Sequence, residues 1–175
     1  MHKKIILMGY MGSGKSILGQ KIAQKLNYTL IDLDNYITKK EKTSITNLFK
    51  TKGEIYFRKL ESLCLEEILN TNKNCVVSLG GGTPCYGVNL KTIKDSKKAT
   101  SIYLHATIEE LTNRLYIEKN TRPIISHLQS KEELMEFIGK HLFERSFYYN
   151  QADLIIKTDA KTPDQLAEEM YIKLL

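Results

Sequence analysis

The sequence predicts an α/β fold in which a five-stranded parallel sheet is covered by helices on both faces. Two observations support this prediction: five short apolar runs occur along the 175 residues, and stretches with helical periodicity separate them. Strands that alternate with helices form parallel sheets, because a crossover helix returns the chain to the same end of the sheet. The length fits one hydrophobic core, so we expect residues 1–175 to form a single domain.

The expected strands are short and mostly apolar, as strands buried on both faces should be. They cover residues 4–8, 29–34, 75–79, 100–105 and 153–158. Right-handed crossovers place the carboxyl ends of parallel strands along one edge of the sheet, where α/β proteins bind ligands. The loops after the first three strands carry glycines or carboxylates, which suits a binding site at that edge.

Helical periodicity and capping residues define the expected helices. Thr107 and Ser130 each precede a glutamate by three residues, and Thr162 precedes Pro163, which are signals that a helix begins. The expected helices cover 15–26, two or three pieces after residue 34 that end with 54–69, residues 88–95, a segment from Thr107, residues 130 to about 150, and the segment from Thr162. A polar stretch at 117–123 is expected to be a loop.

Composition argues against membrane proteins and disulfide-rich proteins. No apolar run approaches the roughly 18 residues that a membrane-spanning helix needs, and the run at 4–8 is too short for a signal peptide. The three cysteines, Cys64, Cys75 and Cys85, form no CxxC pair, so neither a disulfide framework nor a zinc site is expected. We expect a cytoplasmic monomer with no membrane partner.

The net charge of +6 favours acidic partners, but its distribution argues against nucleic acid. A nucleic-acid surface needs clustered basic residues with interleaved aromatic ones, whereas the lysines here are scattered. Only four of the 26 basic residues are arginines: Arg58, Arg114, Arg122 and Arg145. Because arginine offers a planar pair of donors that lysine lacks, they are candidates for binding carboxylate or phosphate, with chance as the alternative.

The stretch GYMGSGKS at residues 9–16 is the clearest motif. It matches GxxxxGK[ST], follows an expected strand and opens an expected helix, which is the setting of a phosphate-binding P-loop. Its backbone N–H groups would surround phosphate oxygens, Lys15 would reach the β- and γ-phosphates, and Ser16 would bind Mg²⁺. A dinucleotide-binding glycine motif fits less well, because Ile17 stands at its third glycine position.

Two carboxylates follow at the end of the second expected strand, in IDLD at 31–34. Asp32 and Asp34 are two residues apart, so in a strand they would point the same way. We expect this strand to lie next to the P-loop strand, where the pair could serve a metal ion and an acceptor hydroxyl. Capping of the following helix is the alternative. The strand at 75–79 lacks a terminal aspartate, so Asp32 is expected to take part of that role, and no NKxD motif of GTPases is present.

Three consecutive glycines, Gly80, Gly81 and Gly82, follow the third expected strand. Such a run is costly in backbone entropy, and it is useful where a ligand must approach the main chain closely. A plain tight turn is the alternative.

These motifs together resemble the shikimate kinase family over nearly the whole chain. The resemblance rests on the P-loop, IDLD, the pattern I…F…GE..FR..E from Ile45 to Glu61, the three glycines, Arg122-Pro123, and RSFYYNQAD from Arg145. It implies a three-layer α/β/α P-loop kinase fold with a helical substrate-binding region at about 33–62 and a mobile lid at about 113–126. It also implies ATP-dependent, Mg²⁺-assisted phosphorylation of the 3-hydroxyl of shikimate, on the route to chorismate and aromatic amino acids.

Residue roles follow from the resemblance in the same way. The implied catalytic residues are Asp34, which orients and deprotonates the hydroxyl, with Lys15 and the lid residue Arg122. The implied ATP-binding residues are Gly12, Ser13, Gly14, Lys15, Ser16, Ile17, Arg114 and Arg122. The implied shikimate-binding residues are Asp34, Arg58, Gly80, Gly81, Gly82 and Arg145, and the metal is bound by Ser16 and, through water, by Asp32. Glu61 lies three residues after Arg58 on one helix, close enough to orient its guanidinium.

The sequence also departs from the family. Ile17 replaces the usual hydroxyl residue, so one side-chain contact to the α-phosphate is lost, and the adenine-contacting segment near 157–162 cannot be aligned. Two alternatives remain at this point. A gluconate-type kinase would not need both the glycine run and the FR..E helix, and a non-catalytic nucleotide-binding module would bind nucleotide without turnover.

Overall fold

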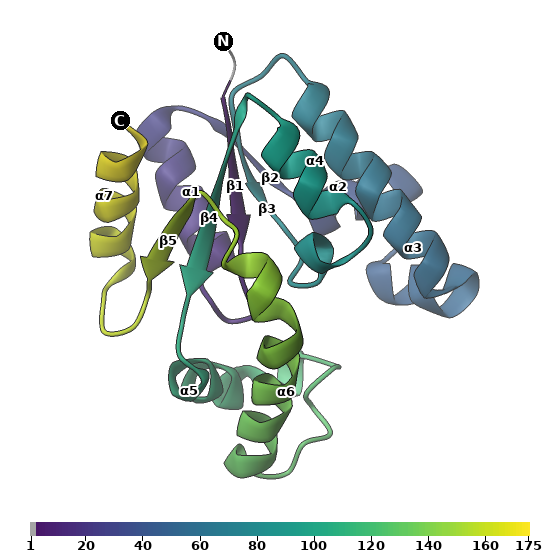
Figure 1. Ribbon diagram of the computed structural model, residues 1–175. Helices are drawn as coiled ribbons and strands as arrows, with labels where there is room; N and C mark the ends of the chain where they lie inside the picture. The colour runs from purple at the N-terminus through teal and green to yellow at the C-terminus, as the bar shows by residue number, and fades with distance from the viewer. Residues whose placement is uncertain (1–2) are drawn as a thin grey trace.

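The structure, a computed structural model, describes residues 3–175 and contains a parallel sheet between layers of helices (Figure 1). Its strands are β1 (Lys4–Met8), β2 (Thr29–Asp32), β3 (Cys75–Ser78), β4 (Ala99–His105) and β5 (Leu154–Lys157). They form a five-stranded sheet in the order β2-β3-β1-β4-β5, and every pairing is parallel. The predicted fold class is confirmed.

Helices cover both faces of the sheet, and two of them lie beyond its carboxyl edge (Figure 1). The helices are α1 (Lys15–Leu26), α2 (Leu33–Glu41), α3 (Ile45–Asn70), α4 (Asn89–Asp95), α5 (Ile108–Glu118), α6 (Lys131–Tyr149) and α7 (Pro163–Leu174), with short 3₁₀ turns η1 (Thr83–Cys85) and η2 (Lys119–Thr121). Helices α1 and α7 pack on one face, and α3 and α4 on the other. No helix within residues 3–175 is long and apolar enough to cross a bilayer.

The core has three parts, and the alternation of β1 explains the first two. Ile5 and Leu7 face the α1 and α7 side, whereas Ile6 and Met8 face the α3 and α4 side. All four are buried, and burial of each such side chain contributes roughly 1.5–3 kcal/mol. A third apolar cluster joins the P-loop residue Tyr10 to helices α5 and α6, so the part of the chain beyond the sheet has its own small core.

The predicted capping residues begin their helices. Thr107, Ser130 and Thr162 each accept a hydrogen bond from the backbone N–H three residues later. The full reciprocal arrangement exists at Thr162 with Gln165. At Ser130, the Glu133 carboxylate instead accepts from the Gln129 backbone, one residue before the cap.

Two expectations about residues 29–34 were wrong. The strand ends at Asp32, whose side chain caps α2 by accepting from the Asn35 N–H at 2.9 Å, so Asp34 lies in the first helical turn. Buried Leu33 anchors that turn in the core. The strand is also not next to β1, because β3 inserts between them. Asp32 and Asp34 nevertheless both reach the carboxyl edge of the sheet.

The helical pieces expected before residue 54 are present as α2 and the first part of α3, which breaks just before the expected 54–69 helix. Gly53 has φ 82° and ψ 171°, which is not helical, and it separates a short segment from Ile45 onward from the long remainder. A positive φ of this size favours glycine. The break lets the helical stretch 45–52 turn away from the helix that carries Arg58.

Candidate active site

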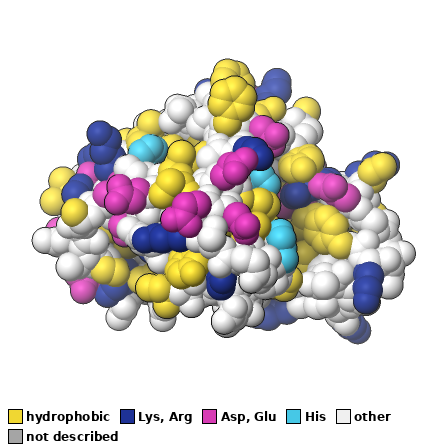
Figure 2. All heavy atoms as spheres, turned by 90° about the horizontal axis from the view of Figure 1, so that it is seen from below, with side chains coloured by type: hydrophobic (Ala, Val, Ile, Leu, Met, Phe, Trp, Pro, Cys, Tyr) yellow, Lys and Arg dark blue, Asp and Glu magenta, His cyan; other side chains and the backbone are white. Residues whose placement is uncertain are grey.

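A cavity of about 650 Å³ lies at the carboxyl edge of the sheet and brings most of the predicted site residues together. The cavity-lining residues that the sequence predicted are Gly12, Ser13, Gly14, Lys15, Ser16, Ile17, Asp32, Asp34, Gly80, Gly81, Arg114 and Arg122. Figure 2 views the molecule from this side, where acidic and basic side chains are interspersed. Of the other predicted residues, Gly82 completes the glycine loop, which we define as residues 80–82, and Arg58 and Arg145 lie beside that loop.

The P-loop has a backbone that only glycine adopts readily. Gly9, Gly12 and Gly14 have φ of 146°, 78° and 96°. A side chain at Gly9 would lie 2.8 Å from the Leu104 carbonyl oxygen. Gly14 caps α1 without any side-chain hydrogen bond, so the first N–H groups of this helix are available to an anion.

Lys15 folds back over the loop in this structure. Its Nζ donates to the carbonyl oxygens of Gly9 at 2.8 Å and Tyr10 at 2.9 Å. Burial lowers the pKa of Lys15 to about 8, although the carboxylates of Asp34 and Asp32 oppose this shift. A phosphate that enters the loop would offer the ammonium group a negatively charged acceptor in place of these neutral carbonyls.

Asp34 lies where the cavity meets the glycine loop. A Cβ placed on Gly80 would be 3.4 Å from Asp34 Oδ1, which shows how closely the carboxylate approaches that loop. Burial raises the pKa of Asp34 to about 6. The carboxylates of Asp32 and Glu61 add to this shift, and the Lys15 ammonium group opposes it. A carboxylate with a pKa near neutrality is a suitable general base.

Ser16 and Asp32 place side-chain oxygen atoms on the wall of the same cavity. Asp32 Oδ1 accepts from the Asn35 backbone, which fixes the carboxylate and leaves its second oxygen for other contacts. Within residues 3–175, no three His, Cys, Asp or Glu side chains are grouped to hold a metal ion. This donor set fits Mg²⁺, which takes few protein ligands and is otherwise bound by phosphate and water.

Arg58 and Arg145 approach the glycine loop from two different helices. A Cβ on Gly82 would lie 3.1 Å from Arg58 Nη2, and one on Gly81 would lie 3.6 Å from Arg145 Nη1. Gly82 has an ordinary φ of −87°, so what requires glycine here is space rather than backbone conformation. The sequence had suggested close approach by a ligand, and the structure adds close approach by the guanidinium of Arg58.

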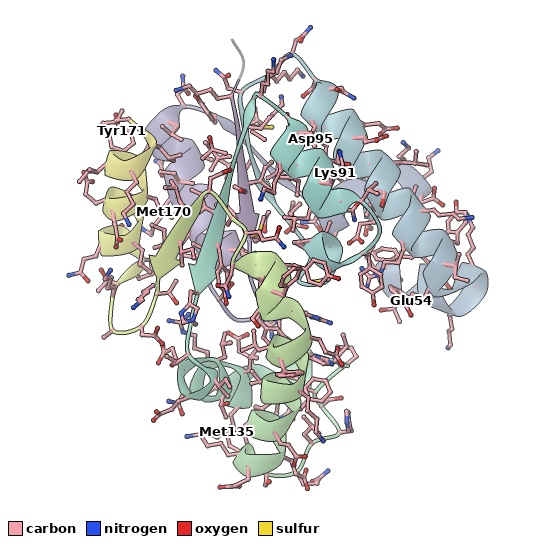
Figure 3. The ribbon with its side chains drawn as sticks, viewed as in Figure 1. Glu54, Lys91, Asp95, Met135, Met170 and Tyr171 are labelled. Carbon is pink, nitrogen blue, oxygen red and sulfur yellow. The ribbon has the colours of Figure 1, made fainter. Side chains whose placement is uncertain are left out.

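A buried network holds Arg58 in place. Arg58 Nη1 donates to Glu61 Oε2 at 2.9 Å, as the sequence predicted, and Thr83 donates to Glu61 Oε1 at 2.6 Å. Glu61 is only 1% exposed, so these two donors, rather than water, satisfy its carboxylate oxygens. The Arg58 guanidinium also stacks on Tyr86, whose hydroxyl donates to Glu54 at 3.1 Å. Figure 3 shows Glu54 on α3, well away from α5 and α6.

Arg114 and Arg122 reach the cavity from the opposite wall. Arg114 donates to the carbonyl oxygens of Gly12 at 3.1 Å and Thr158 at 3.3 Å, so it connects the P-loop to the end of β5. Arg122 is bound to Glu118 by two hydrogen bonds, of 2.6 and 3.0 Å. It therefore lies at the cavity wall without touching the P-loop lysine.

The sequence did not assign one part of the cavity. Lys161, Pro163 and Leu166, around the start of α7, form a wall next to α1. The capping sequence predicted where α7 begins, but not that α7 packs beside α1. The sequence did contain a signal for this wall. Thr162 and Pro163 follow the last strand, and loops that follow parallel strands lie at the carboxyl edge, where ligands bind.

Comparison with known proteins assigns the family. A family model described as Shikimate kinase matches residues 11–175. The chain belongs to the shikimate kinase family. Relatives named shikimate kinase include one from Flavobacterium johnsoniae, 43% identical with 96% of each chain covered, and one from Azobacteroides pseudotrichonymphae, 40% identical with 98% of this chain and 99% of the relative covered.

Solved structures of the family agree with this fold. A shikimate kinase from Bacteroides thetaiotaomicron superposes with a TM-score of 0.88 at 35% identity, covering 98% of both chains. One from Acinetobacter baumannii, solved in complex with shikimate, has a TM-score of 0.84 at 27% identity, covering 99% of this chain and 93% of that one. The predicted family and the predicted class of ATP-dependent kinase are confirmed.

Proposed function

We propose that this chain transfers the γ-phosphate of ATP to the 3-hydroxyl of shikimate, giving ADP and shikimate 3-phosphate. The observation that carries the proposal is the placement of Arg58 and Arg145 against the glycine loop, which lies next to Asp34 and to the P-loop. A related kinase solved in complex with shikimate supports the choice of acceptor.

The nucleotide would bind along the P-loop wall of the cavity. Backbone N–H groups from Gly12 to Ile17, the helix dipole of α1 and Lys15 would bind the phosphates. The backbone of Ile17 remains available even though its side chain offers no hydroxyl. Arg114 and Arg122 would add positive charge from the other wall.

Mg²⁺ would be held by Ser16 directly and by Asp32 through water, together with the phosphates. When bound, the ion would neutralise charge on the transferred phosphoryl group. Asp32 is suited to this part because Asn35 fixes one of its oxygens.

The acceptor would lie on the glycine loop, with its carboxylate between the two guanidiniums. Charged, two-pronged donors match a carboxylate in geometry and in charge. The backbone of Gly80, Gly81 and Gly82 would face the ring hydroxyls, because no side chain separates it from the ligand.

Asp34 would then orient the 3-hydroxyl and accept its proton as the oxygen attacks the γ-phosphorus. Its pKa of about 6 leaves it mostly ionised at neutral pH and basic enough to take that proton. Lys15 and Arg122 would stabilise the charge that develops on the phosphoryl oxygens. Arg122 must first leave Glu118, so we propose that residues 113–126 act as a lid.

We also propose that the chain is one kinase domain over residues 1–175, of which 1 and 2 lie outside the described residues. Residues 33–62 would form the substrate-binding region. We propose further that it acts as a cytoplasmic monomer without nucleic-acid or membrane partners, given its free cysteines and scattered lysines.

A coupled ADP-release assay tests the proposed function. Purified protein with MgATP is given shikimate, gluconate, nucleoside monophosphates or no acceptor. We expect ADP release with shikimate alone, and loss of that signal in Lys15→Met. Release with gluconate would favour the gluconate-type kinase, and nucleotide binding without turnover on any acceptor would favour the non-catalytic module.

A further inference from the structure

Helix α6 carries three side chains at intervals of four residues, His141, Arg145 and Tyr149, which lie against the P-loop or the glycine loop. This spacing places them on one face of the helix. The Tyr149 hydroxyl donates to the Gly81 carbonyl oxygen, and Arg145 stands beside Gly81. Met135 marks the end of α6 far from the sheet (Figure 3). The proposed function uses Arg145, and it gives His141 no part.

His141 contacts the P-loop through Tyr10. Its Nδ1 lies 2.9 Å from the Tyr10 hydroxyl, and the two rings meet edge to face at 5.9 Å. Tyr10 is buried, and its own carbonyl oxygen accepts from Lys15 Nζ at 2.9 Å. Tyr10 therefore contacts α6 through its side chain and Lys15 through its backbone carbonyl.

The direction of this hydrogen bond depends on which imidazole nitrogen carries the proton. Burial raises the pKa of Tyr10 to about 12, so its hydroxyl is a neutral donor. Burial and the nearby Arg145 lower the pKa of His141, while Glu144 opposes that shift. A neutral imidazole with its proton on Nε2 accepts at Nδ1, whereas a protonated imidazole has no acceptor at all.

Few charged groups lie near His141. Arg145 and Glu144 come from its own helix, and Tyr10 comes from the P-loop. Phe137 packs against its ring in a tilted arrangement, with the ring centroids 4.3 Å apart. On α5, which packs against α6, Glu110 pairs with Arg114 and Glu118 pairs with Arg122. A protonated His141 would donate from Nδ1 to the Tyr10 oxygen, so the hydroxyl proton of buried Tyr10 would lose its acceptor. The imidazolium would also face the positive charge of Arg145.

We propose that His141 is a positioning residue whose neutral imidazole, acting through Tyr10, holds the P-loop and Arg145 at a fixed distance, and whose protonation weakens that arrangement. The proposal rests on the proposed function, because that function assigns Lys15 to the phosphates and Arg145 to the acceptor's carboxylate. In a purely structural role, His141 would pack α6 equally well in either protonation state.

The test compares kcat/KM for shikimate between His141→Asn and the wild type, at saturating MgATP, from pH 5 to pH 8.5. The amide oxygen of asparagine can accept from Tyr10 at any pH. We expect kcat/KM of His141→Asn to be within about threefold of the wild-type value at pH 8. The ratio of the variant's kcat/KM to that of the wild type should rise progressively as the pH falls. Titration of Asp34 affects both proteins and cancels in this ratio.

Tyr10→Phe supplies the second arm, because it keeps the ring and removes the donor. At pH 8 we expect it to lose roughly twofold to tenfold in kcat/KM, which is the contribution of one neutral hydrogen bond. In the Tyr10→Phe background, His141→Asn should change little at pH 8, and the pH dependence of its ratio should be lost.

His127→Asn is the matched control. His127 is an exposed histidine that meets the edge of the same Phe137 ring, and its pH ratio to wild type should be flat. Thermal unfolding at pH 8 checks that each variant is folded. A flat ratio for His141→Asn in the wild-type background would overturn the proposal, as would a pH dependence of that ratio that persists in the Tyr10→Phe background.

A readout without turnover separates this proposal from the proposed function. Nitrogen NMR of the unliganded protein should show His141 Nδ1 unprotonated and hydrogen-bonded, with a resonance that shifts in Tyr10→Phe. An unchanged resonance would overturn the contact itself. If wild-type protein showed no turnover on shikimate at any pH, the proposed function would fail, and with it the assignment of Arg145 on which His141's role depends.

Discussion

The guanidinium carbon of Arg58 lies 3.8 Å from the centre of the Tyr86 ring, so a flat cation is stacked on an aromatic face beside the glycine loop. Glu61 holds the same guanidinium from its edge at 2.9 Å. These two contacts together fix both the plane and the rotation of the group that we assign to the acceptor's carboxylate.

Tyr86→Leu should therefore raise KM for shikimate more than it lowers kcat. A cation–π contact contributes roughly 0.5–2 kcal/mol, so we expect about a twofold to thirtyfold rise. Tyr86→Phe keeps the stacked ring and loses only the hydrogen bond to Glu54, and it should stay within about twofold of wild type. Steady-state kinetics would compare KM for shikimate in the two variants. An equal rise in KM in both would mean that the ring does not hold Arg58.

Arg58→Lys should be damaging although it keeps the charge, because lysine cannot donate two parallel hydrogen bonds to a carboxylate. Each charge-assisted hydrogen bond contributes roughly 1.5–3 kcal/mol, so kcat/KM should fall about tenfold to a few hundredfold. An acceptor with an amide in place of the carboxylate completes a double-mutant cycle. Additive losses in that cycle, with ATP affinity unchanged, would show that Arg58 does not bind the carboxylate.

Asp34→Asn should reduce turnover by roughly 10²–10⁴-fold while leaving substrate binding nearly intact. In the wild type, activity should rise with pH through about 6, because the base must lose its proton to act. Pre-steady-state turnover across pH 5 to 8 measures this. A rate within about threefold of wild type would remove Asp34 from the mechanism.

The same substitution should stabilise the unliganded fold at high pH. The pKa of Asp34 is raised on folding, so its ionisation favours the unfolded state, and that penalty is present above about pH 6 and absent below the unfolded pKa of about 4. Asp34→Asn should melt above wild type at pH 8, and the difference should shrink as the pH falls. A difference in melting temperature that is independent of pH would contradict this.

Arg122→Ala should lower kcat, by as much as 10³-fold, more than it raises KM for ATP. The expectation follows from its pairing with Glu118 in this structure, which implies that Arg122 meets the phosphates only after the lid moves. A raised KM with normal kcat would identify Arg122 as a ground-state binder. Glu118→Gln, which weakens the competing pair, serves as the companion variant.

Much of the fold was predictable because it depends on local signals. Buried strands are apolar runs, and capping residues such as Thr162 begin helices wherever the tertiary structure places them. The end of β2 was less predictable, since Asp32 could either continue a strand or cap a helix, and packing of Leu33 decides between the two. The order of the strands could not be predicted from sequence, because no local pattern indicates that β3 lies between β1 and β2.

The candidate site divides in the same way. Motifs with fixed spacing identified the P-loop and the Arg58–Glu61 pair, because both lie within one loop or one helix. The partners that sequence analysis missed, Tyr86 on Arg58 and His141 on Tyr10, are separated by 28 and 131 residues. Only the fold brings such pairs together, and no local pattern signals them.

The low pKa of Lys15 has a consequence for how nucleotide binding would be measured. At pH 8 about half of the unliganded molecules would carry a neutral amine, since the pKa is about 8. Polyphosphate favours the ammonium form, so binding would draw protons from solution. The apparent enthalpy in a calorimeter would then vary with the ionisation heat of the buffer, and affinity would weaken as the solution becomes more alkaline. Exchanging one buffer for another at fixed pH would count those protons directly.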